Sequence, residues 1–226
     1  DLLINSGTKT VWLDHTTPGF AEATDEKKLI GTLNAMSPEL RDSEIGRYLI
    51  YNRAIVHDDY ETFKRLDALK PVYPDEVSPA VTAIIAATVY YAHGDKAAAR
   101  ARVEPLAEPA RAQCQAEPDN FRAALALGSV EFFFGNTAEA LRWIRRAAEL
   151  IPESRDALDA PNWRYNLAWL YANSGDPDQA IAELRRLLSV PSGNNVHGLR
   201  ADQAFFSLRD VPRFQALLND PKNSAP

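Results

Sequence analysis

The stretch VEFFFGNTAEALRWIRRAAELIP, residues 130–152, holds the features that decide the fold. Three consecutive phenylalanines, Phe132, Phe133 and Phe134, run into a Gly-Asn pair, after which an alanine-rich segment ends at a proline. The segments on both sides of Gly135 have the apolar spacing of helices, and a Gly-Asn pair is typical of a tight turn. No single face of a helix can bury three successive side chains. We therefore expect the three rings to pack against different neighbours.

Helix pairs joined by similar turns recur along the chain. From about Pro38 onward the apolar spacing is helical, whereas strand-like alternation is confined to TVWLDH, residues 10–15. The turn residues lie 36, 41 and 40 residues apart, at Asp58, Gly94, Gly135 and Gly175. One helix is interrupted by Pro105 and Pro109, where we expect a break. A near-constant period of helix pairs predicts a stacked array, in which each unit buries its apolar face against its neighbours.

Composition is that of a folded protein and excludes some classes. Among 226 residues, 46% are hydrophobic and 25% are charged, which argues against a disordered chain. The longest apolar run, residues 81–92, is too short to cross a bilayer, so we expect no membrane-spanning segment. A net charge of -6 and a pI near 5.3 argue against a nucleic-acid binder, because phosphate affinity needs clustered Lys and Arg.

The single cysteine and the N-terminus say little about the compartment. Cys114 has no partner for a disulfide, and we expect a buried, inert thiol. The opening DLLINSGTKT lacks the basic region and apolar core of a signal peptide. Because the chain begins with Asp rather than Met, we expect a processed protein or part of a longer one.

The repeated pattern resembles the tetratricopeptide repeat, which has Leu-Gly and Tyr in its first helix and Ala, a large apolar residue, Ala and Pro in its second. Residues 121–152 match it best, through Leu127, Gly128, Gly135, Ala140, Ile144, Ala147 and Pro152. Glu131 departs from the pattern, because it stands at the Tyr position. Residues 161–192 supply Leu167, Ala168, Tyr171, Gly175, Ala180 and Leu184, while residues 80–111 and 44–75 match more weakly.

This resemblance implies an all-α fold, a right-handed superhelical stack of antiparallel helix pairs (a TPR-like α-solenoid) with a C-terminal capping helix. About four pairs are expected over residues 38–192. A partly helical N-terminal segment, 1–37, would precede them, and a cap and tail, 193–226, would follow. Small residues are expected to let paired helix backbones approach closely, at Gly128, Ala140, Ala168 and Ala180.

The end of the chain has a more specific resemblance. VHGLRADQAFFSLRDVPRFQALL, residues 196–218, resembles the closing segment of repeat regions in bacterial signalling proteins. These include serine/threonine kinases, nucleotide cyclases and winged-helix regulators with TolB-like domains. The segment would act as a cap over the last helix pair, through Phe205, Phe206, Leu208, Phe214 and Leu217. In such proteins the region is cytoplasmic or periplasmic, depending on the full-length protein.

No catalytic or cofactor motif is found in the sequence. The histidines are far apart and outside paired zinc patterns, at His15, His57, His93 and His197. SGTKT, residues 6–10, lacks the upstream glycine of a phosphate loop. We therefore predict a protein that is not an enzyme, with no cofactor and no metal site.

The resemblance implies a protein-interaction scaffold that binds a peptide or protein segment in its concave groove. The residues predicted to line the groove are Tyr91, Arg122, Phe132, Asn162, Tyr165, Asn166, Trp169 and Asn173. An apolar platform edged by amides suits an extended peptide, whose backbone needs hydrogen bonds while its side chains need pockets. In this register Phe134 packs within its pair, Phe133 faces the next pair, and Phe132 is available to a partner.

Two alternatives remain open at this point. Trp169 and Tyr165 could instead pack against the closing segment or a neighbouring helix, because aromatic residues at helical spacing are usually core. The array could also serve as a structural or self-association module that holds a homodimer together.

Overall fold

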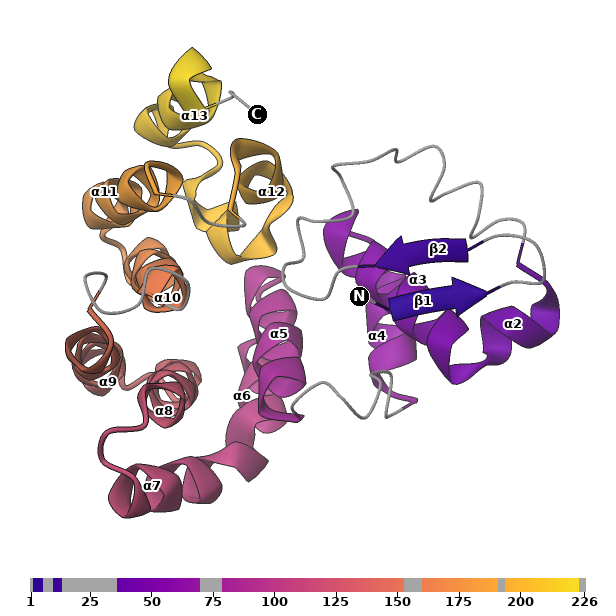
Figure 1. Ribbon diagram of the computed structural model, residues 1–226, viewed down its shortest axis with the longest axis horizontal. Helices are drawn as coiled ribbons and strands as arrows, with labels where there is room; N and C mark the ends of the chain where they lie inside the picture. The colour runs from indigo at the N-terminus through magenta and orange to yellow at the C-terminus, as the bar shows by residue number, and fades with distance from the viewer. Residues whose placement is uncertain are drawn as a thin grey trace. The chain divides into compact units, whose positions relative to one another are not determined.

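The computed structural model (Figure 1) describes residues 2–5, 10–13, 36–69, 79–152, 160–190 and 194–223. The chain divides into two units, residues 1–74 with 193–202 and residues 75–192 with 203–226, and each is described by itself. His15 and most of the first 37 residues lie outside the described residues. The partly helical structure predicted there therefore stays a prediction.

The first unit contains a short hairpin and one repeat-like helix pair. Strands β1 (Leu2–Asn5) and β2 (Thr10–Leu13) are antiparallel, and β2 falls within the stretch of strand-like alternation. The helices are α2 (Pro38–Asp42), α3 (Glu44–Val56), α4 (Tyr60–Asp67) and α12 (Val196–Ala201). Between α3 and α4 the buried rings of Tyr51 and Phe63 lie 5.1 Å apart, and the Tyr51 hydroxyl donates to Asp67 Oδ1. This pair therefore has a core of its own.

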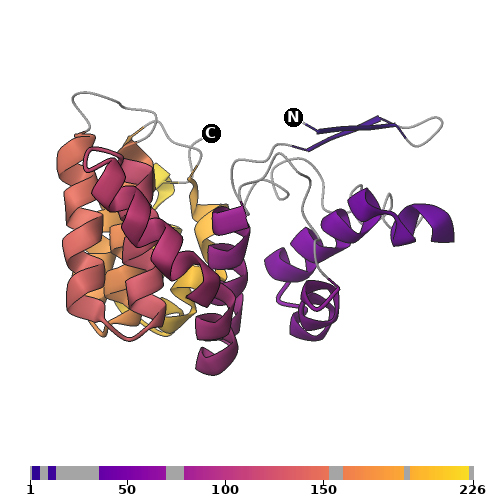
Figure 2. The same ribbon diagram turned by 90° about the horizontal axis from the view of Figure 1, so that it is seen from below.

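The second unit is a series of packed helix pairs. Its elements are α5 (Pro79–Ala92), α6 (Lys96–Val103), η2 (Glu104–Leu106), α7 (Ala107–Ala116), α8 (Phe121–Phe133), α9 (Thr137–Leu150), α10 (Ala160–Asn173), α11 (Pro177–Leu188), η3 (Gln203–Leu208), α13 (Pro212–Asn219) and η4 (Pro221–Asn223). Helices α8 to α11 stand side by side (Figure 2), with α8 and α10 on the inner side of the arc and α9 and α11 on the outer side (Figure 1). The predicted all-α stack of helix pairs is confirmed.

The predicted break in the second pair is also confirmed. Helix α6 ends at Val103, the 3-10 turn η2 contains Pro105, and α7 begins at Ala107. Proline cannot donate the backbone hydrogen bond that a continuing helix requires. Pro109 lies in the first turn of α7, where that donor is not needed.

Each helix pair turns through the same backbone geometry. Gly94, Gly135 and Gly175 have φ of 81°, 86° and 85°, and Asp58 has φ of 60°. These values lie in the left-handed region that glycine adopts without steric cost. In every case the residue after this turn residue donates its backbone N–H to the carbonyl oxygen five residues before it, over 2.8 to 3.0 Å. The four hydrogen bonds run from Asp59 to Ala54, from Asp95 to Tyr90, from Asn136 to Glu131 and from Asp176 to Tyr171. The turns predicted from spacing are therefore equivalent in structure.

Small residues bring α8 and α9 into close contact, as predicted. A Cβ atom at Gly128 would lie 2.7 Å from Ile144 Cγ1 and 3.2 Å from the Ala140 carbonyl oxygen. The equivalent small residues Ala140, Ala168 and Ala180 are fully buried. Larger side chains at these positions would push the paired helices apart.

Two parts of the closing segment, η3 and α13, lie in the second unit and pack against different helices. Helix α13 packs against α11, with Phe214 and Leu217 buried and Arg213 paired with Asp178 at 2.7 Å. It therefore caps the last pair. The preceding segment, η3, instead packs against α5 and α10.

Replacement of Gly128 by alanine should destabilise the protein. In an isolated helix Gly→Ala is stabilising by about 1 kcal/mol, but here the added methyl group meets Ile144. We expect the free energy of unfolding to fall by about 1–3 kcal/mol, the usual cost of overpacking. Urea denaturation followed by circular dichroism measures the change, and a stabilised Gly128→Ala variant would contradict the close approach.

Candidate protein-binding surface

Aromatic rings from α5, α8 and α10 form one continuous cluster on the inner side of the second unit. The Tyr91 ring lies 5.0 Å from Phe132 and 6.0 Å from Phe133. The Trp169 ring lies 4.6 Å from Phe132 and 5.4 Å from Phe133. Three first helices of successive pairs are thus joined by ring contacts. We call this side of α5, α8 and α10, with Tyr165 and Asn173 of α10, the inner surface.

The two central rings of this cluster are buried. Phe132 is 4% exposed and Trp169 is 3% exposed. The prediction that Phe132 is the phenylalanine left available to a partner is therefore wrong, because Tyr91, Phe133 and Trp169 surround its ring. The pattern placed Phe132 on the inner side but could not show how closely neighbouring rings cover it.

The other two phenylalanines divide their contacts between pairs. Phe133 contacts Trp169 of the next pair, as predicted, and also Tyr91 of the preceding pair. Phe134 is half-buried, and the guanidinium of Arg100 on α6 lies 4.7 Å from its ring centre. Arg100 belongs to the preceding pair, so contacts of Phe134 extend beyond its own pair.

The η3 segment lies on the inner surface and is held by both rings and hydrogen bonds. Phe205 packs edge-on against Tyr165 at 5.4 Å, and Phe206 packs edge-on against His93 at 6.2 Å. The side-chain amide of Asn173 donates to the Ala204 carbonyl oxygen at 2.9 Å. The Ser207 hydroxyl donates to the Ala172 carbonyl oxygen at 3.0 Å. The inner surface therefore already holds a short stretch of peptide.

The remaining predicted residues differ in their surroundings. Asn173 also donates to the Trp169 carbonyl one turn earlier, which orients its amide toward Ala204. Asn166 is half-buried on α10, while Arg122 is exposed with its guanidinium over the Phe121 ring. The side chain of Asn162 lies outside the described residues. The structure thus brings Tyr91, Phe132, Trp169, Tyr165 and Asn173 to one side.

Packing of Tyr165 against the closing segment was one of the alternatives open from the sequence, but coverage of the inner surface by residues 203–208 as far as α5 was not predicted. The adjacent pair Phe205-Phe206 was a signal, because two neighbouring aromatic residues before a capping helix need apolar partners. The sequence pattern predicts it as part of the cap over the last pair. Instead Phe205 is buried against α10, and η3 reaches α5 as well.

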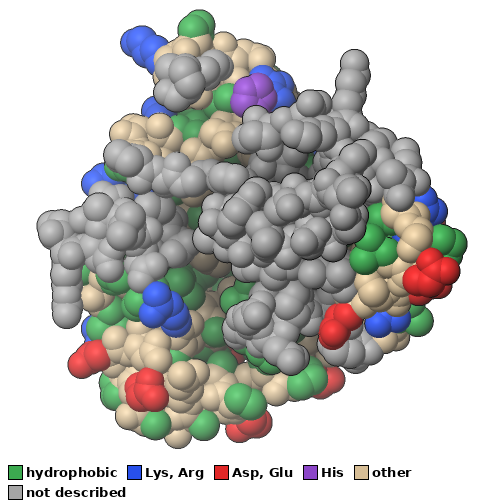
Figure 3. All heavy atoms as spheres, turned by 45° about the vertical axis from the view of Figure 1, so that its right-hand side comes forward, with side chains coloured by type: hydrophobic (Ala, Val, Ile, Leu, Met, Phe, Trp, Pro, Cys, Tyr) green, Lys and Arg blue, Asp and Glu red, His purple; other side chains and the backbone are tan. Residues whose placement is uncertain are grey.

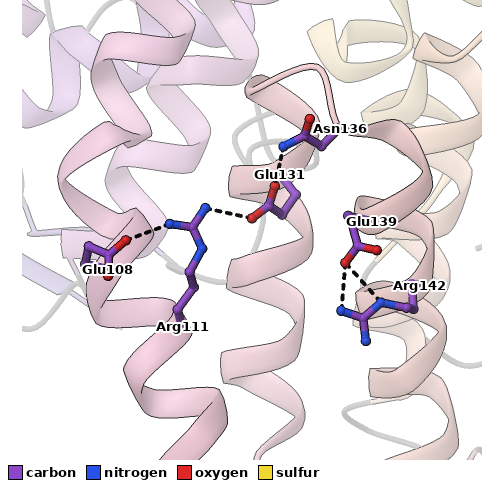
Figure 4. A network of polar contacts seen from close by, with 6 residues as sticks. All are labelled: Glu108, Arg111, Glu131, Asn136, Glu139 and Arg142. Atoms are coloured by element: carbon purple, nitrogen blue, oxygen red, sulfur yellow. Dashed lines mark hydrogen bonds and ion pairs between the residues drawn. The ribbon is translucent and has the colours of Figure 1, made fainter.

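Glu131, the residue that departs from the repeat pattern, joins two neighbouring pairs. It is 7% exposed and accepts from Arg111 Nη2 of α7 at 2.9 Å and from the Asn136 amide at 2.6 Å (Figure 4). Arg111 also donates to Glu108. The hydrogen bonds to Glu131 and Glu108 raise the pKa of the Arg111 guanidinium. A carboxylate at the Tyr position therefore links α7, α8 and the following turn.

Other features of the described residues concern the single cysteine, metal ligands, helix length and surface charge. Cys114 is buried beside Ala110, Ala123 and Leu127, and burial raises the pKa of its thiol, as expected for an unreactive cysteine. Within the described ranges no three side chains of His, Cys, Asp or Glu gather to hold a metal ion. None of the helices in those ranges is both long and apolar enough to span a membrane.

On the face in Figure 3 the described acidic and basic side chains are scattered.

Comparison with known proteins supports the repeat assignment for part of the chain. Residues 119–191 match the family model described as tetratricopeptide repeat. This range spans α8 to α11, the two pairs with the fullest repeat pattern. No curated protein matches the chain. The chain is thus similar to tetratricopeptide repeat proteins, which generally mediate protein–protein interactions and are typically scaffolds without catalytic activity.

Replacement of Glu131 by glutamine should weaken the connection between neighbouring pairs. Arg111 and Asn136 donate to different oxygens of the Glu131 carboxylate, so in glutamine one of these donors would face an NH2 group, which cannot accept. We expect the free energy of unfolding to fall by roughly 1–2 kcal/mol, measured by urea denaturation. Glu139→Gln is the matched control, because Glu139 pairs with Arg142 on the surface (Figure 4) and should give no measurable change. Equal effects of the two changes would contradict a special role for Glu131.

Proposed function

We propose that this chain is a non-enzymatic protein-interaction module that binds a peptide or protein segment on its inner surface. The general function follows from the repeats, which typically bind proteins. The more specific site is supported by one observation, the way in which α10 holds residues 204–207. The same groups would serve a partner segment.

The inner surface offers a peptide one contact that does not depend on the peptide sequence and one contact that does. The Asn173 amide donates to a main-chain carbonyl, a group that every peptide has. The Tyr165 ring contacts an aromatic side chain edge-on, which only some peptides offer. Main-chain hydrogen bonds contribute affinity and side-chain contacts contribute specificity.

The cellular context that we propose is a bacterial signalling or regulatory protein. It rests on the resemblance of residues 196–218 to the closing segments of repeat regions in such proteins. In that context the module would recruit a protein segment to the domain that carries the signalling activity.

Tyr165 provides the test of the site. A peptide array is probed with the full chain carrying Phe206→Ala, which loses the ring contact to His93 that helps to hold the internal segment, residues 203–208. Tyr165→Ala added to it should weaken peptide binding at least ten-fold, because the ring contact of Tyr165 is lost. Tyr171→Ala is the matched control, since Tyr171 is also a half-buried tyrosine of α10 but bonds to Arg145 of α9. Circular dichroism establishes that both variants are folded. Undiminished capture by folded Tyr165→Ala would rule out the proposed site.

Self-association is a second candidate function. Among the described residues the exposed large apolar side chains are Leu69, 57% exposed, and Val81, 49% exposed. A second copy of the chain could cover Val81, since apolar surface is commonly buried in symmetric dimers. Light scattering across concentration should then show a dimer for the natural chain and a monomer for Val81→Glu. A strictly monomeric natural chain would exclude this candidate.

A further inference from the structure

We propose that residues 203–208 are an internal competitor on the inner surface, and that the partner is a peptide with two adjacent aromatic residues preceded by a small one. The inference rests on the proposed function, and it adds the chemistry of the ligand and the group that regulates access. The occupant seen in the structure is Ala204-Phe205-Phe206-Ser207 of the chain itself. Its contacts define what an external segment must offer.

Three features of the occupied surface specify the ligand. Tyr165 and His93 each receive one ring, from Phe205 and Phe206 respectively, so two consecutive aromatic side chains are accommodated at separate places, on α10 and in the turn after α5. Asn173 donates to the carbonyl of the residue before the pair, which is alanine here. A small residue at that position lets the peptide backbone approach the amide. The described contacts therefore favour a small-aromatic-aromatic sequence.

The internal segment has the properties of a displaceable ligand. It is a 3-10 segment with non-helical backbone angles at Phe205, so it lacks the continuous hydrogen-bond ladder of an α-helix. Phe206 is half-buried, and the guanidinium of Arg209 lies 3.2 Å from its ring centre. Helix α13 is separately attached to α11 through Arg213 and Asp178. On this proposal residues 203–208 would leave the inner surface while the cap stays in place, with Phe205 and Leu208 giving up their buried positions to the anchors of the partner.

Because residues 203–208 belong to the same chain as the inner surface, they compete strongly with an external peptide even if their contacts are few. A tethered segment acts at an effective concentration of the order of millimolar, far above that of a typical partner. A protein whose binding-competent state is populated only fractionally shows an affinity reduced by that fraction. Weakening the internal segment should therefore increase affinity for an external peptide.

The experiment uses the full chain and two synthetic peptides. Fluorescein-labelled QAFFSL, the sequence of residues 203–208, and QAAASL are titrated into the natural chain, Phe206→Ala and Phe121→Ala, with fluorescence anisotropy as readout. Phe121 is the matched control, because it is a half-buried phenylalanine with an arginine over its ring on another helix. Thermal unfolding establishes that the variants are folded.

We expect Phe206→Ala to bind QAFFSL at least ten-fold more tightly than the natural chain and Phe121→Ala do, and QAAASL to bind all three weakly. Tyr165→Ala added to Phe206→Ala should abolish the gain. If Phe206→Ala fails to fold, Ser207→Ala serves instead, because it removes only the hydrogen bond to Ala172 and should increase the affinity in the same direction.

Two results would overturn the inference, and neither is the result that tests the proposed function. Equal affinity for QAFFSL in the natural chain and Phe206→Ala would show that residues 203–208 do not compete, while peptide binding itself stands. No preference for QAFFSL over QAAASL would show that the aromatic pair is not recognised. Failure of the Phe206→Ala chain, whose internal segment is weakened, to capture any peptide of the array would instead contradict the proposed function.

Discussion

A helix pair cannot bury its apolar face alone, and this constraint governs the second unit. Close contact between α8 and α9 at Gly128 and Ile144 brings the two backbones together, and α10 then packs against both. The first helices α5, α8 and α10 are thereby placed side by side, which allows rings from each to meet around Phe132 and Trp169. The inner surface is therefore a product of stacking and not of any single helix.

Much of this architecture could be predicted from local sequence signals. Turn residues with positive φ, such as Gly94 and Gly135, recur at a near-constant period, and small residues such as Gly128 mark the helix contacts. The positions of Tyr165 and Asn173 on the inner side also followed from helical register. These features depend on residues close in sequence, so the pattern contains the information.

The state of the inner surface could not be predicted in the same way. Burial of Phe132 depends on rings from α5 and α10, and coverage by η3 depends on residues far along the chain. A helical pattern tells which side a residue faces, but it does not tell which distant segment packs there. The alternative that these aromatic residues pack within the protein agrees with the observed contacts, because Tyr165 packs against the closing segment and Trp169 against a neighbouring helix. The hydrogen bond from Asn173 shows that the same surface also holds a peptide backbone.

The repeated turn has a consequence for the order of folding. Each turn is closed by a hydrogen bond that spans five residues, such as Asp95 to Tyr90, so the turns can form from local contacts, which favour rapid folding. The contact between His93 and Phe206 instead joins the two ends of the second unit. Closure of the inner surface by η3 therefore needs residues far apart in the sequence, and on a ribosome it must wait until residues 203–208 have been synthesised.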